Sequence, residues 1–552
     1  MNVRIVAAAL LVVAPMGTSA TAAFPFRTVA LTGQPATGLP AGLTLSRIRP
    51  PVINEDGVIA FDAVLAGPGI NYTHPSNAYT VWREQDGVLT NIVRSGEQAV
   101  GLPAGVKIYL PGSPKIDGEG RVAFLAEAPG GDAHGIFSEG QGALRLVARE
   151  TDAAPGVTGG AFWIFGGPLM NNAGHVAFTA FLRGPGLPPA AESLWSDRSG
   201  TLALVIREGL PAPGIAGASI LQVGSHVLND LGVIAFQGRY TGGVYPNDTA
   251  IWTESGGNFS LIARSGQAPA ALPSGGQLGS LSAPRINNAG QLLFQGTLTG
   301  TGVTTENDRA LWLHDAGALE LIARKGEGAL GMPAGVNHGG FVYSYVNGAG
   351  EATFIGTLVG SGVTSQNDTA LWSQRGDALN LIAREGDPAP GTPLGTTFGD
   401  LTRLGGGPDG FLINDKSQVA FQAPLTGIGV TNANDAGIWV TDLTGALRLI
   451  AREGDSFDVN DDPMIADLRT VKFVDLRWFN GGGEDGFASS FNNSGQLAFA
   501  LNFTDFTDGA FVVETAIPEP STVLLAGSSL FGLAAIRRRK QNPPAPLQRI
   551  VK

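Results

Sequence analysis

The sequence predicts an all-β protein that folds as a single eight-bladed β-propeller. Three observations lead there: a turn-rich composition, a short motif that occurs eight times, and a complementarity between the two ends of the chain. The 552 residues include 80 Gly and 35 Pro. Short runs of Val, Ile, Leu and Phe are broken by Gly, Asn, Asp and Pro, which predicts many β-strands joined by turns.

The recurring motif is Asn-x-x-Gly-x-x-Ala-Phe. Asn and Gly both tolerate the positive φ of a tight turn, and the residues that follow favour strands. We expect each copy, such as residues 287–294, to form the corner and inner strand of one blade. Variants begin at Asn54, Asp117, Asn171, Asn229, Asn287, Asn347, Asn414 and Asn492.

Three further pieces complete each repeat. The first is an aliphatic–aromatic pair such as Leu311-Trp312, and the second is a Leu-x-Leu-Ile-Ala-Arg-x-Gly segment such as residues 319–326. We expect a fourth strand before the next Asn, for example near residues 398–404. The repeats are about 63 residues apart on average, longer than the ~40–50 residues of common propeller repeats.

The count of these pieces predicts that the blades form a closed ring. The Asn-x-x-Gly piece occurs eight times, but only seven Leu-Ile-Ala-Arg pieces follow, and residues 27–33 resemble the missing one. A blade built from both ends of the chain explains this and leaves no sheet edge open. Two smaller propellers or tandem β-sandwich modules are the alternatives.

Most repeated side chains have an expected structural role. The Phe of Ala-Phe and the Trp of the second piece should fill the space between blades, with a carbohydrate platform as the alternative for a Trp. The repeated Arg residues should pair with a carboxylate or a strand-end carbonyl. An Asn-Asp pair four residues before several of the Trp residues predicts a turn that caps the entering strand; the alternative is a ring of polar groups for a cation or sugar hydroxyls.

The two ends of the chain differ from the body. Residues 1–23, with Arg4, an apolar run and a small-residue stretch, are typical of a secretory signal peptide. The repeat domain should span residues 24–515. Residues 516–552 contain an apolar run that ends at Ile536 and is followed by Arg537-Arg538-Arg539-Lys540. This run is short for a membrane span, and its basic cluster should stay cytoplasmic.

Composition excludes several classes of function. The formal charge is −12, and the body without its two ends is more acidic still. Such a surface argues against nucleic acid as a partner. The absence of Cys excludes disulfides, thiolate metal sites and a Cys nucleophile. No zinc-protease spacing, phosphate loop or nucleophile elbow is present, so the sequence selects no catalytic residue and favours a protein that is not an enzyme.

One acidic loop is a candidate metal site. Asp458, Asn460 and Asp462 alternate as the oxygen ligands of a calcium loop do. Pro463 then stands where such a loop has Gly, and Arg469 stands where it has its twelfth-position Glu. Calcium is therefore the one cofactor that the sequence suggests, with a solvated acidic loop as the alternative.

The carboxyl terminus resembles a PEP-CTERM sorting signal. Pro518-Glu519-Pro520 is followed by the apolar run and by Arg537, Arg538 and Arg539, with an extension to Lys552 that is longer than usual. The resemblance implies a Gram-negative source, processing by an exosortase, and transient anchoring in the inner membrane with the body in the periplasm. The mature protein is then expected at the cell surface or outside the cell.

The body is similar to tandem-repeat proteins that carry one of several alternative surface anchors, a resemblance that implies location rather than chemistry. We expect a non-catalytic propeller that binds exopolysaccharide or another matrix component. The alternatives are a hydrolase or lyase with its site at the central channel, and a structural coat protein.

Overall fold

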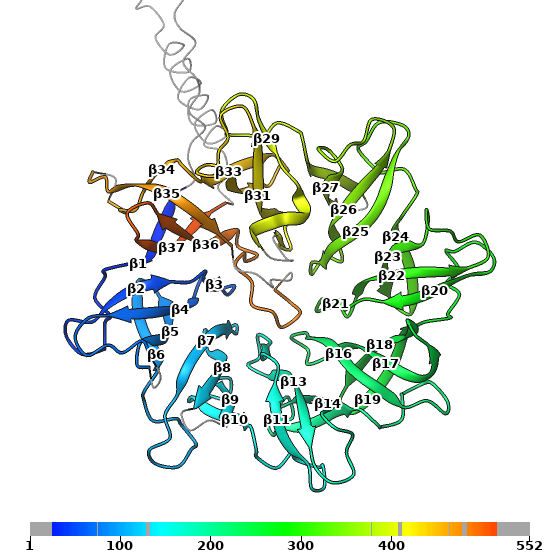
Figure 1. The fold of residues 1–552 in the computed structure, drawn as a ribbon, viewed down its shortest axis with the longest axis horizontal. Helices are drawn as coiled ribbons and strands as arrows, with labels where there is room; N and C mark the ends of the chain where they lie inside the picture. Colours follow the sequence, from blue (N-terminus) through cyan, green and yellow to red (C-terminus); the bar gives the residue numbers. More distant parts are fainter. Residues whose placement is uncertain are drawn as a thin grey trace, which may run out of the picture.

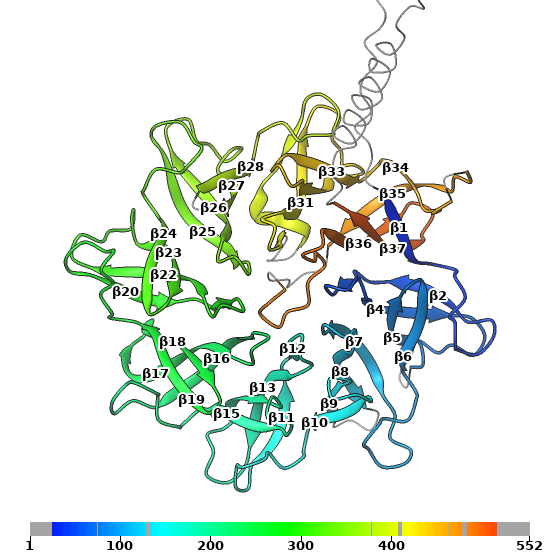
Figure 2. The same cartoon turned by 180° about the vertical axis from the view of Figure 1, so that it is seen from behind.

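A computed structural model shows the predicted ring of eight blades (Figure 1). It describes residues 25–515, except 74–75, 129–132, 377, 407–410, 463 and 477–482. The blades follow one another around the ring in chain order, and the view from behind shows the same arrangement (Figure 2). The eight-bladed propeller predicted from the repeat count is confirmed, and neither two propellers nor tandem sandwiches are present in the described part of the chain.

Each blade is an antiparallel sheet whose innermost strand lies toward the centre of the ring (Figure 1). In four blades this strand is split into two segments. The innermost strands are β2 (Thr44–Ile48), β3 (Val52–Ile53), β7 (Tyr109–Ile116), β11 (Ala161–Phe165), β12 (Leu169–Met170), β16 (Ile220–Leu228), β20 (Gly276–Leu281), β21 (Arg285–Ile286), β25 (Val336–Val346), β29 (Thr396–Phe398), β30 (Phe411–Ile413) and β35 (Leu468–Asp475).

The second strand of each blade carries the Ala-Phe of the motif. These strands are β4 (Ile59–Ala66), β8 (Val122–Ala128), β13 (Val176–Arg183), β17 (Ile234–Val244), β22 (Leu292–Gly300), β26 (Ala352–Gly360), β31 (Val419–Gly427) and β36 (Gln496–Phe503). The expectation that the motif forms the inner strand is therefore wrong. The preceding segment pairs with it on the channel side, because the Asn turn is the corner between the first and second strands.

The third strands hold the aliphatic–aromatic pairs. They are β5 (Tyr79–Gln85), β9 (Ala133–Ser138), β14 (Ala191–Ser196), β18 (Asn247–Ser255), β23 (Arg309–Asp315), β27 (Thr369–Arg375), β32 (Ala436–Thr441) and β37 (Asp508–Glu514). The outer strands hold the Leu-Ile-Ala-Arg pieces. They are β6 (Val88–Arg94), β10 (Arg145–Arg149), β15 (Ala203–Arg207), β19 (Asn258–Arg264), β24 (Ala318–Arg324), β28 (Ala378–Arg384), β33 (Leu447–Arg452) and β1 (Phe26–Leu31).

The blade that closes the ring is built from both ends of the described chain. β1 pairs antiparallel with β37, with Phe26 opposite Val513 and Leu31 opposite Gly509. It takes the place that a Leu-Ile-Ala-Arg strand takes in the other blades, as the sequence predicted. The short β34 (Ser456–Asp458) extends this sheet beyond β35.

Residues 398–404 depart from the expected fourth strand. β29 ends at Phe398, and a 3₁₀ turn, η1 (Leu401–Gly406), follows it. Thr402 donates both its N–H (2.9 Å) and its hydroxyl (2.6 Å) to Asp400 Oδ1. This local turn competes with strand pairing, so the inner edge of this blade resumes only at β30.

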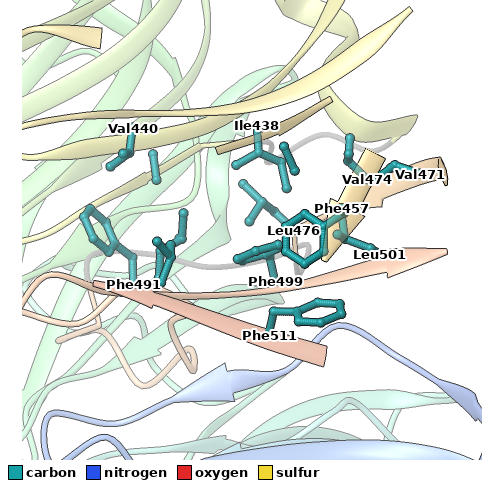
Figure 3. Packing of buried hydrophobic residues seen from close by; sticks show 14 of the residues in the cluster. Ile438, Val440, Phe457, Val471, Val474, Leu476, Phe491, Phe499, Leu501 and Phe511 are labelled. Atoms are coloured by element: carbon teal, nitrogen blue, oxygen red, sulfur yellow. The ribbon is translucent and has the colours of Figure 1, made fainter. Parts of the chain in front are cut away.

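The apolar core lies between neighbouring blades rather than at the centre of the ring. The motif Phe and the Trp of the next strand are direct cross-strand partners, as for Phe354 and Trp372, and both are fully buried. Figure 3 shows one interface, where Ile438 and Val440 of one blade face Phe499 and Phe511 of the closing blade. Full burial confirms the packing role of these aromatics and excludes a carbohydrate platform on this Trp. Burying one such side chain contributes roughly 1.5–3 kcal/mol.

Candidate functional site

The eight Asn turns form a continuous belt around the central channel. The side chains at these positions are all at most 5% exposed. In seven of the eight links, the amide Nδ2 of one turn donates to the backbone carbonyl of the equivalent residue in the next blade. Examples are Asn229 to Asn287 at 3.1 Å and Asn287 to Asn347 at 2.9 Å. Asn492 donates to Asn54 at 2.9 Å, so the belt passes through the closing blade.

The same Asn side chains also hold their own turns. Oδ1 of Asn287 accepts the backbone N–H of Gln291 at 2.9 Å, and Oδ1 of Asn54 accepts that of Val58 at 2.8 Å. Each of these Asn side chains therefore accepts a backbone N–H in its own blade and donates to a carbonyl of the next blade. A turn former is expected here from the local sequence, but the link between blades joins residues about 60 positions apart in the chain.

Asp117 is the exception in the belt. Its carboxylate cannot donate, and it instead accepts the Nε of Arg121 at 2.7 Å. Burial raises the pKa of Asp117 against the opposing effect of Arg121. Here the next blade is reached by a backbone contact, Gly118 N to Asn172 O at 3.3 Å.

A second ring of polar side chains comes from the residues directly after the belt positions. Carboxylates and amides alternate in it: Asp230 accepts from the Nδ2 of Asn172 at 2.9 Å and from that of Asn288 at 2.7 Å. Asp415 accepts from the Nδ2 of Asn493 at 2.7 Å, and Glu55 accepts the backbone N–H of Asn493 at 2.9 Å.

Two of these positions, Gly118 and Gly348, carry no side chain, and Glu484 fills the second gap from a different part of the chain. Gly348 directly follows the belt residue Asn347. Carboxylate oxygens of Glu484 and Asp415 both lie 2.8 Å from the place that a Cβ on Gly348 would take. Glu484 accepts the backbone N–H of Asn288 at 2.8 Å. Burial raises the pKa of Glu484 to about 7, and Asp415 and Asp230 add to the shift. Burial also raises the pKa of Glu55 and of Asp415.

Glu484 belongs to a segment that enters the channel, residues 483–490, which we call the plug. In Figure 1 the chain before β36 runs from the closing blade into the middle of the ring. Three inner strands donate backbone N–H groups to it: Ile53 to Ser489 O (2.8 Å), Met170 to Gly486 O (3.0 Å) and Leu228 to Asp485 O (2.9 Å). The plug therefore bonds to edges that would otherwise stay unpaired in the channel.

Charged and aromatic groups fix the plug on its other sides. Asp485 is buried beside Arg285, with an Nη1–Oδ2 distance of 3.7 Å, and burial raises the pKa of its carboxyl. The guanidinium of Arg285 also lies 5.0 Å from the ring centroid of Phe487. Only the structure shows that this segment lies in the channel.

The predicted calcium residues lie on the rim of the closing blade, away from the channel. Their side-chain oxygens accept local backbone N–H groups: Asp458 from Asn460 (3.1 Å) and Asp467 (2.8 Å), Asn460 from Asp462 (3.0 Å), and Asp462 from Met464 (2.9 Å). Among the described residues, no three His, Cys, Asp or Glu side chains gather to hold a metal ion. Calcium binding here stays a prediction. The sorting-signal residues, Pro518 to Pro520 and Arg537 to Arg539, lie outside the described residues.

Two other repeated features are structural. Arg324 donates its Nε to Asn307 O at 3.1 Å, and Arg384 donates to Asn367 O at 3.1 Å, which confirms the strand-end carbonyl as a partner. Asn307 also closes its own turn through Thr304 N to Oδ1 at 2.8 Å. The Asn-Asp pair thus caps a turn here, as its first interpretation predicts. Within the part of the chain that the structure describes, no helix is long and apolar enough to cross a membrane.

Comparisons with known proteins identify a family and the sorting motif. A family model described as "Family of unknown function (DUF7453)" matches residues 20–243 and 239–524. The model of the PEP-CTERM protein-sorting motif matches residues 516–540. No curated protein matches the chain at a significant level.

Similar solved structures are propellers with little sequence identity. The β-propeller domain of the Trilobed protease from Pyrococcus furiosus is 10% identical over 74% of this chain and 99% of its own, with a TM-score of 0.37. The Dos1 propeller is 10% identical over 87% and 98%, also at 0.37. Pyrococcus horikoshii acylaminoacyl peptidase is 11% identical over 83% of this chain and 58% of its own, at 0.38. These values carry no conclusion about activity.

Proposed function

The chain belongs to the DUF7453 family of unknown function, and from its PEP-CTERM motif and channel we propose that it is an exported binding protein for exopolysaccharide or another matrix component. The motif indicates an exported protein that is sorted to the cell surface and processed by an exosortase. The observation that carries the proposal is this motif at the end of an eight-bladed propeller.

The point where the chain leaves the propeller supports a binding role for the opposite side. Thr515 is the last described residue, and it donates its N–H and its hydroxyl to Gly495 O, both at 2.7 Å. Gly495 is the glycine of the Asn492 turn, so the described chain ends on the side of the belt. An anchor attached after Thr515 would leave the other channel mouth free to meet a ligand.

A glycan array and an exopolysaccharide pull-down with the purified chain test the proposal. We expect retention of at least one extracellular polysaccharide, with affinity that survives physiological salt. Failure to retain any glycan or matrix protein would overturn the binding role and favour a structural coat protein.

The ring of carboxylates favours a second candidate, a hydrolase or lyase that acts on extracellular polymers. Glycosidases use two nearby carboxyl groups, one of which is kept protonated near neutral pH. Glu484, with a pKa of about 7, and the neighbouring Asp415 have these properties. Release of reducing ends from polysaccharide by the wild type, lost in Glu484→Gln, would support this candidate. Equal release by both, or none by either, would contradict it.

A further inference from the structure

A cavity lies in the channel wall beside the plug and has no role in the belt or the carboxylate ring. It has two neighbouring lobes of about 430 and about 440 Å³ that share Gly167, Leu169 and Phe487. Its walls come from three successive blades: from β7 and β8, from β11 to β14, and from β16. Thr179 and Phe181 of the wall lie well along β13 from the Asn171 turn, so the cavity extends away from the belt. Its size is that of small-molecule sites, about 300–1,000 Å³.

A buried histidine in this wall has an unpaired ring nitrogen. His226 is 9% exposed, and its Nε2 is buried without a partner among the described residues. Burial lowers the pKa of His226 to about 4, so the ring is neutral and one of its two nitrogens is an acceptor and the other a donor. A buried polar atom without a partner is unfavourable, and a ligand hydroxyl that reaches Nε2 would supply the missing hydrogen bond in either tautomer.

Other wall groups suit the same kind of ligand. Glu192 accepts the N–H of Val223 at 2.9 Å with one carboxylate oxygen, and the Nε2 of Gln222 lies 3.4 Å from the other, a weak contact that leaves acceptor capacity. Phe165, Phe181 and Phe487 supply apolar faces in the same lobe. Hydroxyl acceptors beside aromatic faces fit a neutral sugar, whose ring has polar edges and C–H faces, whereas the Glu192 charge disfavours an acidic one.

We propose that this cavity binds a neutral sugar unit of an extracellular polysaccharide, with one hydroxyl hydrogen-bonded to His226 Nε2 and another donating to Glu192. The inference rests on the proposed binding function and names its site. The residues that would recognise the sugar come from three blades and are not part of the repeated motif.

A cavity-filling variant with a matched control tests it. Gly167 lines both lobes, its φ is not positive, and a Cβ there meets nothing within 4 Å, so Gly167→Trp should place its indole in the cavity. Gly328 has the same freedom, is exposed, and lies outside the cavity, so Gly328→Trp is the control. The full-length chain in detergent is titrated by calorimetry with neutral gluco-, galacto- and manno-tetrasaccharides and with oligogalacturonate.

We expect a neutral tetrasaccharide to bind the wild type and Gly328→Trp alike, and Gly167→Trp at least about a hundredfold more weakly. Equal binding by all three would overturn the cavity site and leave the binding function standing. Binding of oligogalacturonate alone would overturn the ligand class. No binding of any polysaccharide by the wild type would overturn the function and the inference together.

A second pair of variants tests His226 itself. His338 is also buried with a pKa lowered to about 4, but it packs against Phe341, Phe354 and Trp372 and is not part of the cavity wall. His226→Phe should weaken sugar binding about ten- to hundredfold, and His338→Phe should leave it unchanged. Equal affinities in both folded variants would contradict the contact with His226.

Discussion

The belt and the plug line the same channel, yet they connect the blades in different ways. The belt repeats one contact, an Asn amide on the backbone of the next turn, around the ring. The plug occurs once and uses a different atom at each blade, from the Ser489 carbonyl at Ile53 to the Glu484 carboxylate at Asn288. Repetition therefore closes the ring, and the single-copy segment makes the sectors of the channel chemically different.

Removing ring closure should affect both regions and have the largest effect. Deletion of residues 25–31 removes β1, which buries Val29 and Ala30 between the closing blade and the first blade. We expect the deletion variant to aggregate and to lose its cooperative thermal transition. A synthetic peptide of residues 25–33 should restore the transition. A deletion variant that unfolds like the wild type would contradict closure by this strand.

Breaking one link of the belt should cost less. Asn287→Asp keeps the acceptor for Gln291 N–H but loses the donor to Asn347 O and introduces a buried charge. We expect the free energy of unfolding, measured with urea, to fall by at least about 1–3 kcal/mol. Asn380→Asp is the control, because Asn380 is exposed and its amide bonds locally to Ala378. Equal stability of the two variants would argue against the belt.

Displacing the plug should act locally. Gly486 has φ +82, and a Cβ there would stand 2.9 Å from the Leu228 carbonyl oxygen. Gly486→Val should lower the hydrogen-exchange protection of the Ile53, Met170 and Leu228 amides about tenfold while global unfolding changes little. Gly483→Val is the control, since Gly483 also has positive φ but its Cβ would meet only Ser489 Cβ at 3.6 Å. Unchanged protection in Gly486→Val would contradict these bonds.

The smallest expected effect is a pH dependence that the plug has and an Asn link lacks. The pKa of Glu484 is raised to about 7, so its protonated form favours the folded state. This stability is fully present below the ordinary Glu pKa of about 4.3 and is lost as pH rises through 7. Glu484→Gln should reduce the fall of the thermal midpoint between pH 5 and 8, and Glu453, whose pKa burial raises to about 8, should contribute to the fall that remains. Equal falls of the midpoint in the wild type and the variant would refute the assignment.

Much of the fold could be predicted because the repeat is visible in the chain. The eight turns and the lone match at residues 27–33 were enough to predict the blade number and the closing strand. Strand order within a blade was predicted less well. The motif from Asn287 to Phe294 would have the same sequence whether its strand lined the channel or was the second strand of the blade. The candidate site was hardly predictable: Glu484, Asp485 and His226 stand in no motif.

The sequence alone determined the propeller, its closure and its sorting tail, since each depends on local patterns that recur or stand at a chain end. Only the tertiary structure decided what the belt Asn side chains bond to, where the plug lies and which wall carries the cavity. Those features join residues of different blades, and their chemistry follows from burial: an amide, a carboxylate or an imidazole acquires its role from the groups that the ring brings next to it.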